Sequence, residues 1–324
     1  MKAYVYGANG AEITDVAKPA PKGPQVLVRV RACGLNRADL GMTKGHAHGS
    51  AGGAGTVLGM EWAGEIAELG PDAKGVKVGD RVMGSGGAAF AEYALADHRR
   101  LFHIPPNANM SYEDAATLPV ALTTMHNAVV TNGALQAGQS VLIQGASSGV
   151  GLMAMQIAKL KGAKLVIGSS TDAMRRGRLK EFGADLAVDS SDPAWVDQVL
   201  KATDGEGVDL IVDQVSGKVA NQNLAATKVK GRIVNVGRLG GTHADFNFDL
   251  HAARRISYIG VTFRSRSIEE VREIFDEVRK DIWAAVESRK LQLPIDKVFA
   301  FDDIGKAFER MDANQHLGKI IVTL

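Results

Sequence analysis

The chain has 324 residues, of which 38 are Lys or Arg and 36 are Asp or Glu, so its formal net charge is +2. A chain of this length is expected to form about two domains. The balanced charge argues against nucleic acid as the main partner, because proteins that bind polyanions concentrate basic residues on one face. A small or neutral substrate is the simpler expectation.

A single cysteine, Cys33, excludes an internal disulfide and a thiolate zinc cage. Such sparing use of cysteine is typical of a reducing compartment, so we expect a cytoplasmic protein. Residues 1–7 lack the long apolar core of a signal peptide. No stretch approaches the ~18 uncharged apolar residues of a membrane span. The sequence therefore predicts no association with a membrane.

The chain up to about residue 120 is predicted to form short strands separated by frequent turns. Apolar residues alternate along residues 25–31, and further short segments of this kind occupy residues 64–70 and 79–83. This pattern indicates an antiparallel, barrel-like domain. A glycine-dense segment at residues 44–56 is interpreted as a flexible loop or as a mobile lid over a cleft.

From about Gln139 the pattern changes to an alternation of strands and helices, which predicts a parallel sheet with helices on both faces. A helix with a serine N-cap is predicted after Ser267, with apolar residues at helical spacing at positions 268, 271, 274, 275 and 278. The predicted strands lie at residues 141–143, 165–167, 186–188, 209–212, 231–236 and 256–261.

The first of these strands continues into the small-residue turn GASSGVG at residues 145–151, and a helix starts near Gly149. Backbone amides in such a turn can approach a pyrophosphate, because no side chain blocks them and a helix N-terminus favours negative charge. On the G-x-G-x-x-G pattern the three positions are Ala146, Ser148 and Gly151, so only the last is glycine. The surrounding strand–helix–strand context predicts dinucleotide binding; the alternative is a structural glycine-rich turn.

The end of the second strand bears on the choice of cofactor. In NAD-binding forms of this fold an acidic residue there accepts hydrogen bonds from the ribose hydroxyls. Here residues 166–170 contain no carboxylate, whereas Arg175, Arg176 and Arg178 follow closely enough to meet a 2′-phosphate. This favours NADPH. Alternatively, the arginines lie on a solvated helix face. At least one of them must do so, because side chains at positions 175, 176 and 178 cannot all lie on the same face of a helix.

Ordered motifs along essentially the whole chain carry a family resemblance. They are CGLNRAD at 33–39, LGMEWAG at 58–64, VGDRV at 78–82, GASSGVG at 145–151, FGAD at 182–185 and HLGKIIV at 316–322. The arrangement resembles the zinc-independent quinone oxidoreductase branch of the medium-chain dehydrogenase/reductase superfamily. The segment GVTFRSRS at 260–267 is similar to that of the subgroup that reduces quinones with NADPH.

The resemblance implies an α/β protein in which a Rossmann doubly wound parallel sheet is combined with a GroES-like, mainly antiparallel β catalytic domain. We expect residues 1–122 to form the catalytic domain and residues 123–262 to form the NADP-binding domain. Residues 263–324 are expected to return to the catalytic domain.

No metal site is predicted. Zinc-dependent relatives place a cysteine and a histidine at the sites matching Asn36 and Met60, and neither residue here supplies a normal zinc ligand. His46 and His48 form an H-x-H pair without further ligand types nearby in sequence. Cys33 is interpreted as a small buried apolar residue.

The resemblance also indicates site residues. Asn36 and Thr123 are expected to contact the substrate or the nicotinamide; the alternatives are a local turn role for Asn36 and a capping or core role for Thr123. Asp39 and Glu61 are interpreted as structural carboxylates, paired with Arg37 or Arg81. The expected cofactor contacts are Ser147, Ser148, Gly149 and Val150 at the pyrophosphate, Ser170 and Arg175 at the 2′-phosphate, Val215, Gly237, Arg238 and Leu239 after later strands, and Phe263, Arg264, Asn314 and Lys319 from the returning chain.

These expectations define an NADPH-dependent oxidoreductase that transfers a hydride to a quinone or a similar electron-poor carbonyl conjugate without zinc. One alternative is an alkene reductase acting on α,β-unsaturated carbonyls. An alternative of another class is an NADPH-binding structural or regulatory protein with little turnover, because its cofactor motifs would be the same. The strand at 256–261 is a candidate exposed edge, so a homodimer is also expected.

Overall fold

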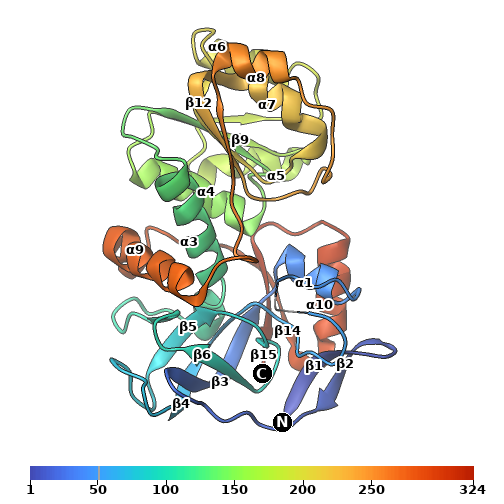
Figure 1. Ribbon diagram of the computed structural model, residues 1–324, viewed down its shortest axis with the longest axis vertical. Coiled ribbons are helices and arrows are strands. Elements are labelled where there is room, and N and C mark those ends of the chain that lie inside the picture. The colour runs from blue at the N-terminus through green and yellow to red at the C-terminus, as the bar shows by residue number, and fades with distance from the viewer. Residues whose placement is uncertain (50–51) are drawn as a thin grey trace. The chain divides into compact units, whose positions relative to one another are not determined.

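The computed structural model describes residues 1–49 and 52–324. The chain forms two compact units, shown in Figure 1. Unit 1 comprises Met1–Thr123 and Phe263–Leu324, and unit 2 comprises Thr124–Thr262. None of the described helices is both long and apolar enough to cross a membrane.

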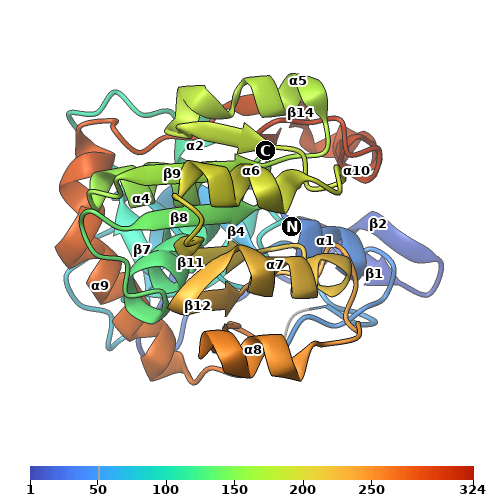
Figure 2. The same cartoon turned by 90° about the horizontal axis from the view of Figure 1, so that it is seen from above.

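Unit 2 is built on a six-stranded parallel sheet with the order β10-β9-β8-β11-β12-β13, whose central strands lie side by side in Figure 2. The chain moves outward from β8 to β10, returns to β11 and then moves the other way. Because crossovers between parallel strands are right-handed, this reversal places helices on both faces. The predicted α/β fold is confirmed. The strands are β8 Ser140–Gln144, β9 Leu165–Ser169, β10 Leu186–Val188, β11 Val208–Asp213, β12 Thr227–Asn235 and β13 Ser257–Gly260.

The helix after β8 explains the position of the turn. Ser148 has extended backbone angles and caps the helix α4, and Gly162 ends it in the left-handed region at φ +81°. The chain reverses direction in the sheet between β8 and β11, which is where ligands bind in open α/β sheets. The helical segments of unit 2 are η1 Asn127–Asn132, α4 Gly149–Leu160, α5 Ala173–Gly177, η2 Leu179–Phe182, α6 Trp195–Ala202, η3 Gly217–Val219, α7 Ala220–Ala226 and α8 Phe248–Arg254.

Unit 1 contains a seven-stranded sheet with the order β14-β15-β3-β4-β5-β7, in which β6 also pairs with β3, and a separate two-stranded sheet. Its pairs are antiparallel except for β14 with β15, so the antiparallel domain predicted from the alternating segments is present. The strands are β1 Lys2–Gly7, β2 Gly10–Asp15, β3 Gln25–Gly34, β4 Glu61–Leu69, β5 Arg81–Ser85, β6 Tyr93–Asp97, β7 Leu101–His103, β14 Ile295–Ala300 and β15 Lys319–Thr323.

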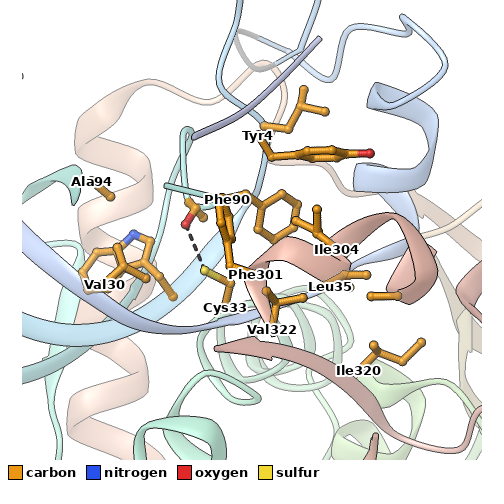
Figure 3. Packing of buried hydrophobic residues seen from close by; sticks show 14 of the residues in the cluster. Tyr4, Val30, Cys33, Leu35, Phe90, Ala94, Phe301, Ile304, Ile320 and Val322 are labelled. Atoms are coloured by element: carbon orange, nitrogen blue, oxygen red, sulfur yellow. Dashed lines mark hydrogen bonds between the residues drawn. The ribbon is translucent and has the colours of Figure 1, made fainter. Parts of the chain in front are cut away.

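The core of unit 1 packs aromatic and aliphatic side chains around the end of β3 (Figure 3). Tyr4 and Phe90 each lie 5.8 Å from the ring of Phe308. Cys33 has no exposed surface, and its Sγ donates a hydrogen bond to the carbonyl of Ala89 at 3.0 Å, drawn as a dashed line in Figure 3. The prediction of a buried Cys33 is confirmed.

The predicted helix after Ser267 is present as α9, and it begins with a capping box between Ser267 and Glu270. Its buried face includes Val271, Phe275 and Val278. Ile268 shares the apolar spacing but is 60% exposed in the first turn. The helical segments of unit 1, of which α3 continues into unit 2, are α1 Arg37–Met42, α2 Tyr112–Ala115, α3 Pro119–His126, α9 Ile268–Glu287, η4 Phe301–Asp303 and α10 Ile304–Asp312.

Candidate functional site

The turn between β8 and α4 presents backbone N–H groups at the N-terminal end of the helix. Ser148 Oγ accepts a hydrogen bond from the N–H of Gly151 at 3.1 Å and donates to the carbonyl of Gly145 at 2.9 Å. The first N–H groups of a helix have no acceptor within it, so those of Gly149 and Val150 can donate to an anion. A Cβ on Gly151 would lie 2.6 Å from the Gly145 carbonyl oxygen, so only glycine allows this close contact.

Buried polar side chains behind the turn hold it in place, and the sequence reasoning missed them. Gln144, the last residue of β8, has no exposed surface. Ser169 Oγ donates to Gln144 Oε1 at 2.6 Å and accepts from the N–H of Gly145 at 3.0 Å. Ser148 Oγ also lies 2.9 Å from Gln214 Oε1, so its single proton is shared between this oxygen and the Gly145 carbonyl. Buried polar groups are usually hydrogen-bonded, so a polar residue at the carboxyl end of an apolar strand was the signal to look for.

Asp213, the last residue of β11, extends this network. It is fully buried; its Oδ1 accepts from the N–H groups of Val215 at 2.8 Å and Ser216 at 2.9 Å. Its Oδ2 accepts from Asn223 Nδ2 at 3.0 Å, and Asn223 Oδ1 accepts from Gln144 Nε2 at 2.8 Å. Burial raises the pKa of Asp213, and the N–H donors oppose that shift. The bonds to Ser216 stabilise its backbone in the left-handed region at φ +56°.

The residues predicted to contact the cofactor after β11 and β12 lie in two adjoining loops at the same edge of the sheet. The N–H of Gly237 donates to the carbonyl of Asp213 at 3.1 Å. The carbonyl of Val215 accepts from the N–H of Gly240 at 2.6 Å. Arg238 is exposed, and Leu239 is 57% exposed. These contacts bring the loops together beside the turn after β8.

The residues predicted to meet a 2′-phosphate follow β9. Ser170 is buried, and its Oγ donates to Ser147 Oγ at 3.0 Å. The Arg175 N–H donates to the Asp172 carboxylate at 2.8 Å, and Arg175 Nε lies 3.6 Å from the same carboxylate. Arg176 Nη1 donates to the carbonyl of Ser170 at 2.8 Å. The structure thus brings Ser147, Ser170 and Arg176 together, whereas the sequence favoured Arg175.

In unit 1, Asn36 lies in a buried polar cluster with Glu61 and Lys319. Lys319 Nζ donates to Asn36 Oδ1 at 2.9 Å and forms an ion pair with Glu61 Oε1. Asn36 Nδ2 donates to Glu61 Oε1 at 2.9 Å, and Glu61 Oε2 accepts from the N–H of Val120 at 2.9 Å. The side chains of Lys319 and Glu61 are 5% and 0% exposed. Because Lys319 only donates, the cluster fixes the orientation of the Asn36 amide.

The arginine partners expected for the two carboxylates were wrong. Glu61 pairs with Lys319. Asp39 Oδ2 accepts from the N–H of Asn36 at 2.7 Å and completes the capping box of α1. Asp39 is fully buried, and burial raises its pKa to about 7. Arg81 Nη2 donates to a backbone carbonyl at 2.9 Å.

The side chain of Thr123 has a partner within its own helix, and that of Asn314 has a partner on α1. Thr123 is buried, and its Oγ1 donates to the carbonyl of Pro119 at 2.7 Å within α3. Asn314 Oδ1 accepts from Arg37 Nη2 at 2.8 Å, which explains where the Arg37 guanidinium lies. The Thr123 hydroxyl can still accept a hydrogen bond, but its proton is committed to the helix.

Phe263 and Arg264 begin the second segment of unit 1. The Arg266 guanidinium lies 5.9 Å from the ring centre of Phe263. Burial, together with the charge of Arg264, lowers the pKa of His48. Among the described residues, no group of three or more His, Cys, Asp or Glu side chains could hold a metal ion. The proposed lid at 44–56 includes residues 50–51, which lie outside the described residues, so the lid stays a prediction.

The fold and the edge of the parallel sheet define a dinucleotide-binding class of protein, and comparisons with known proteins identify its family. Residues 22–106 match the alcohol dehydrogenase GroES-like domain, and residues 149–280 match the zinc-binding dehydrogenase family. Mouse quinone oxidoreductase-like protein 2 is 31% identical over 96% of this chain and 88% of its own length. The chain belongs to the quinone oxidoreductase-like family of medium-chain dehydrogenase/reductase oxidoreductases.

Other matches are to parts of larger proteins or to solved structures. The chain is 29% identical over 96% of its length to a component of the phenolphthiocerol/phthiocerol polyketide synthase of Mycobacterium tuberculosis, and it spans 14% of that protein. An alcohol dehydrogenase superfamily protein from Novosphingobium aromaticivorans shares 30% identity with a TM-score of 0.89, covering 100% of this chain and 99% of that one. The CurK enoyl reductase shares 25% identity with a TM-score of 0.87, covering 99% of each chain.

Proposed function

We propose that the protein is an NADPH-dependent oxidoreductase that reduces quinones or similar electron-poor carbonyl conjugates without zinc. The observation that carries the proposal is the capped N-terminus of α4 at the reversal of the sheet, where a Cβ on Gly151 would collide with the turn. Ser147, Ser148, Gly149 and Val150 would hold the pyrophosphate there. The nicotinamide cofactor, when bound, supplies the hydride.

The preference for NADPH rests on the residues that follow β9. Ser170 occupies the position where NAD-binding folds place an acid, and guanidinium groups follow it in α5. Ser170 and Arg175 are proposed as contacts of the 2′-phosphate, because charge-assisted hydrogen bonds from arginine suit a phosphate. The remaining cofactor contacts, also proposals, are Val215, Gly237, Arg238, Leu239, Phe263, Arg264, Asn314 and Lys319.

Asn36 remains the proposed contact for the substrate or the nicotinamide. One Nδ2 hydrogen is held by Glu61, but the other donates to the carbonyl of Gly34 at 3.4 Å, a weak bond that a developing oxyanion could replace. Thr123 could contribute only as an acceptor. We propose that the protein works without zinc for two reasons. The ammonium of Lys319 already supplies a cation to Glu61 and Asn36. The amide of Asn36 and the thioether of Met60 are poor zinc ligands.

The matches to a polyketide synthase and to the CurK enoyl reductase favour reduction of an α,β-unsaturated carbonyl as the second candidate. A panel assay separates the candidates by following NADPH absorbance with an ortho-quinone, a para-quinone and an enone, and the reverse reaction with an alcohol and NADP. Oxidation by quinones alone supports the first proposal, and preference for the enone supports the second. Binding of NADPH without oxidation by any acceptor would support a structural or regulatory protein instead. Stoichiometric zinc in the purified protein would contradict zinc-independence.

We further propose a homodimer that pairs at β13, which is the edge strand of the sheet in unit 2. Next to this edge, Tyr258 is 37% exposed and Phe248 is 75% exposed, and both pack on Phe246. Sedimentation equilibrium tests this proposal: a monomer at micromolar concentration would refute it. The substrate is proposed to be a small molecule.

A further inference from the structure

A carboxylate lies at the edge of the sheet beside Ser170, although β9 itself does not supply one. Asp189 is the first residue after β10, and β10 pairs with β9 so that Val188 lies opposite Ser169. The N–H of Ser170 donates to the carbonyl of Val188 at 3.0 Å. The third strand of the sheet therefore places an acid next to the position that lacks one in the second strand.

Arg176 bridges Ser170 and this carboxylate. Its Nη1 donates to the carbonyl of Ser170 at 2.8 Å and to Asp189 Oδ2 at 3.0 Å. The other oxygen, Asp189 Oδ1, accepts from the N–H and Oγ of Ser191. Side chains of Arg176 and Asp189 are only 25% and 26% exposed. The pair is therefore held in a fixed position beside the Ser170–Ser147 hydroxyl contact.

The other arginines of this segment have different neighbours. Arg175 Nε faces the Asp172 carboxylate at 3.6 Å. Arg178 Nη2 pairs with Glu181 at 2.9 Å, and both of those side chains are about half exposed, at 51% and 46%. Among the three, Arg176 is the arginine whose guanidinium contacts Ser170.

We propose that Arg176 is a ligand of the cofactor's 2′-phosphate and that Asp189 restrains it, so that this pair sets the preference between NADPH and NADH. The inference rests on the proposed nucleotide site. A guanidinium forms charge-assisted hydrogen bonds with a phosphate. The carboxylate of Asp189 competes with a phosphate for this guanidinium, because Asp189 Oδ2 accepts a hydrogen bond from Arg176 Nη1 at 3.0 Å. Arg176 therefore favours NADPH, and Asp189 reduces that preference.

Calorimetric titration of the full chain with NADPH and with NADH tests the proposal. Asp189→Asn keeps the shape of the side chain and its contact with Ser191, and it should raise the ratio of NADPH to NADH affinity several-fold. Arg176→Met should lower NADPH affinity about tenfold or more and change NADH affinity little. The double variant should behave like Arg176→Met, because Asp189 acts through Arg176. Arg178→Met is the matched control and should change neither affinity.

An unchanged affinity ratio in Asp189→Asn, with NADPH binding to the unmodified protein intact, overturns this inference and leaves the proposed function standing. Equal losses for both nucleotides in Arg176→Met overturn it as well. If the unmodified protein binds neither nucleotide, the proposed function fails. Thermal unfolding of each variant checks the fold, and Asp189→Ser provides a second removal of the carboxylate if Asp189→Asn does not fold.

Discussion

Removing the Lys319 ammonium should destabilise unit 1 strongly, because it leaves the Glu61 carboxylate buried without its cation. The two side chains are 5% and 0% exposed, so water cannot replace the lost partner. Breaking a buried ion pair by removing one partner costs about 3–5 kcal/mol. We therefore expect Lys319→Met to lower the free energy of unfolding of unit 1 by about this amount, whereas Lys319→Met combined with Glu61→Gln should cost less than Lys319→Met alone.

Tryptophan fluorescence during urea unfolding measures this effect. The chain has three tryptophans, and only Trp195 lies in unit 2, so a Trp195→Phe background restricts the signal to Trp62 and Trp283. Lys306→Met is the matched control; it removes a lysine that pairs with an acid at 2.7 Å but is 69% exposed, and it should cause no measurable loss. If Lys319→Met costs no more than the control, or if the double variant is no more stable than Lys319→Met, the buried ion pair does not stabilise unit 1 in this way.

Three further predictions concern protonation, the turn and the cap. The folded pKa of Asp39, about 7, lies above its ordinary 3.8, so between those pH values the folded state retains a proton that the unfolded state has lost, and stability falls as pH rises. In urea unfolding, the free energy of unfolding of Asp39→Asn should therefore fall by up to about 4 kcal/mol less than that of the unmodified protein between pH 4 and pH 8. If the difference in free energy of unfolding between the two proteins does not change with pH, the raised pKa of Asp39 is contradicted. Gly151→Ala should weaken NADPH binding about tenfold or more in fluorescence titration, because the turn must shift to admit the Cβ. Gly177→Ala is the control and should leave NADPH binding unchanged, because a Cβ there meets nothing within 4 Å. Equal effects of the two substitutions would exclude the steric explanation. Ser148→Ala and Ser267→Ala should each lower the free energy of unfolding by about 1 kcal/mol in urea unfolding. Only Ser148→Ala should also reduce NADPH affinity. If both variants lose NADPH affinity equally, the Ser148 cap has no specific role in nucleotide binding.

Local patterns predicted much of the fold. The strand and helix alternation indicated β8 to β13, because β8, β9 and β11 are short apolar runs and α4 has a helical apolar period and a serine cap. The serine that caps α9 was identified from its place before an amphipathic segment. Apolar spacing does not reveal that Ile268, in the first turn of that helix, is exposed.

The polar contacts of the candidate site were harder to predict, because tertiary pairing creates them. Lys319 and Glu61 are 258 positions apart in sequence. They meet because β15 pairs with β3, and the N–H of Leu35 donates to the carbonyl of Ile320 at 3.0 Å. The charge of the side chains does not predict whether Glu61 pairs with this lysine or with an arginine nearer in sequence. The same holds for Arg176, since the register of β10 on β9 brings Asp189 to it.

We propose that the turn before α4 binds the diphosphate of a nicotinamide dinucleotide. Calorimetric titration of the purified full chain with NADPH, and separately with NADH, measures this binding. We expect saturable binding of one NADPH per chain, tighter than that of NADH. The absence of measurable binding of either nucleotide by a correctly folded protein would contradict it.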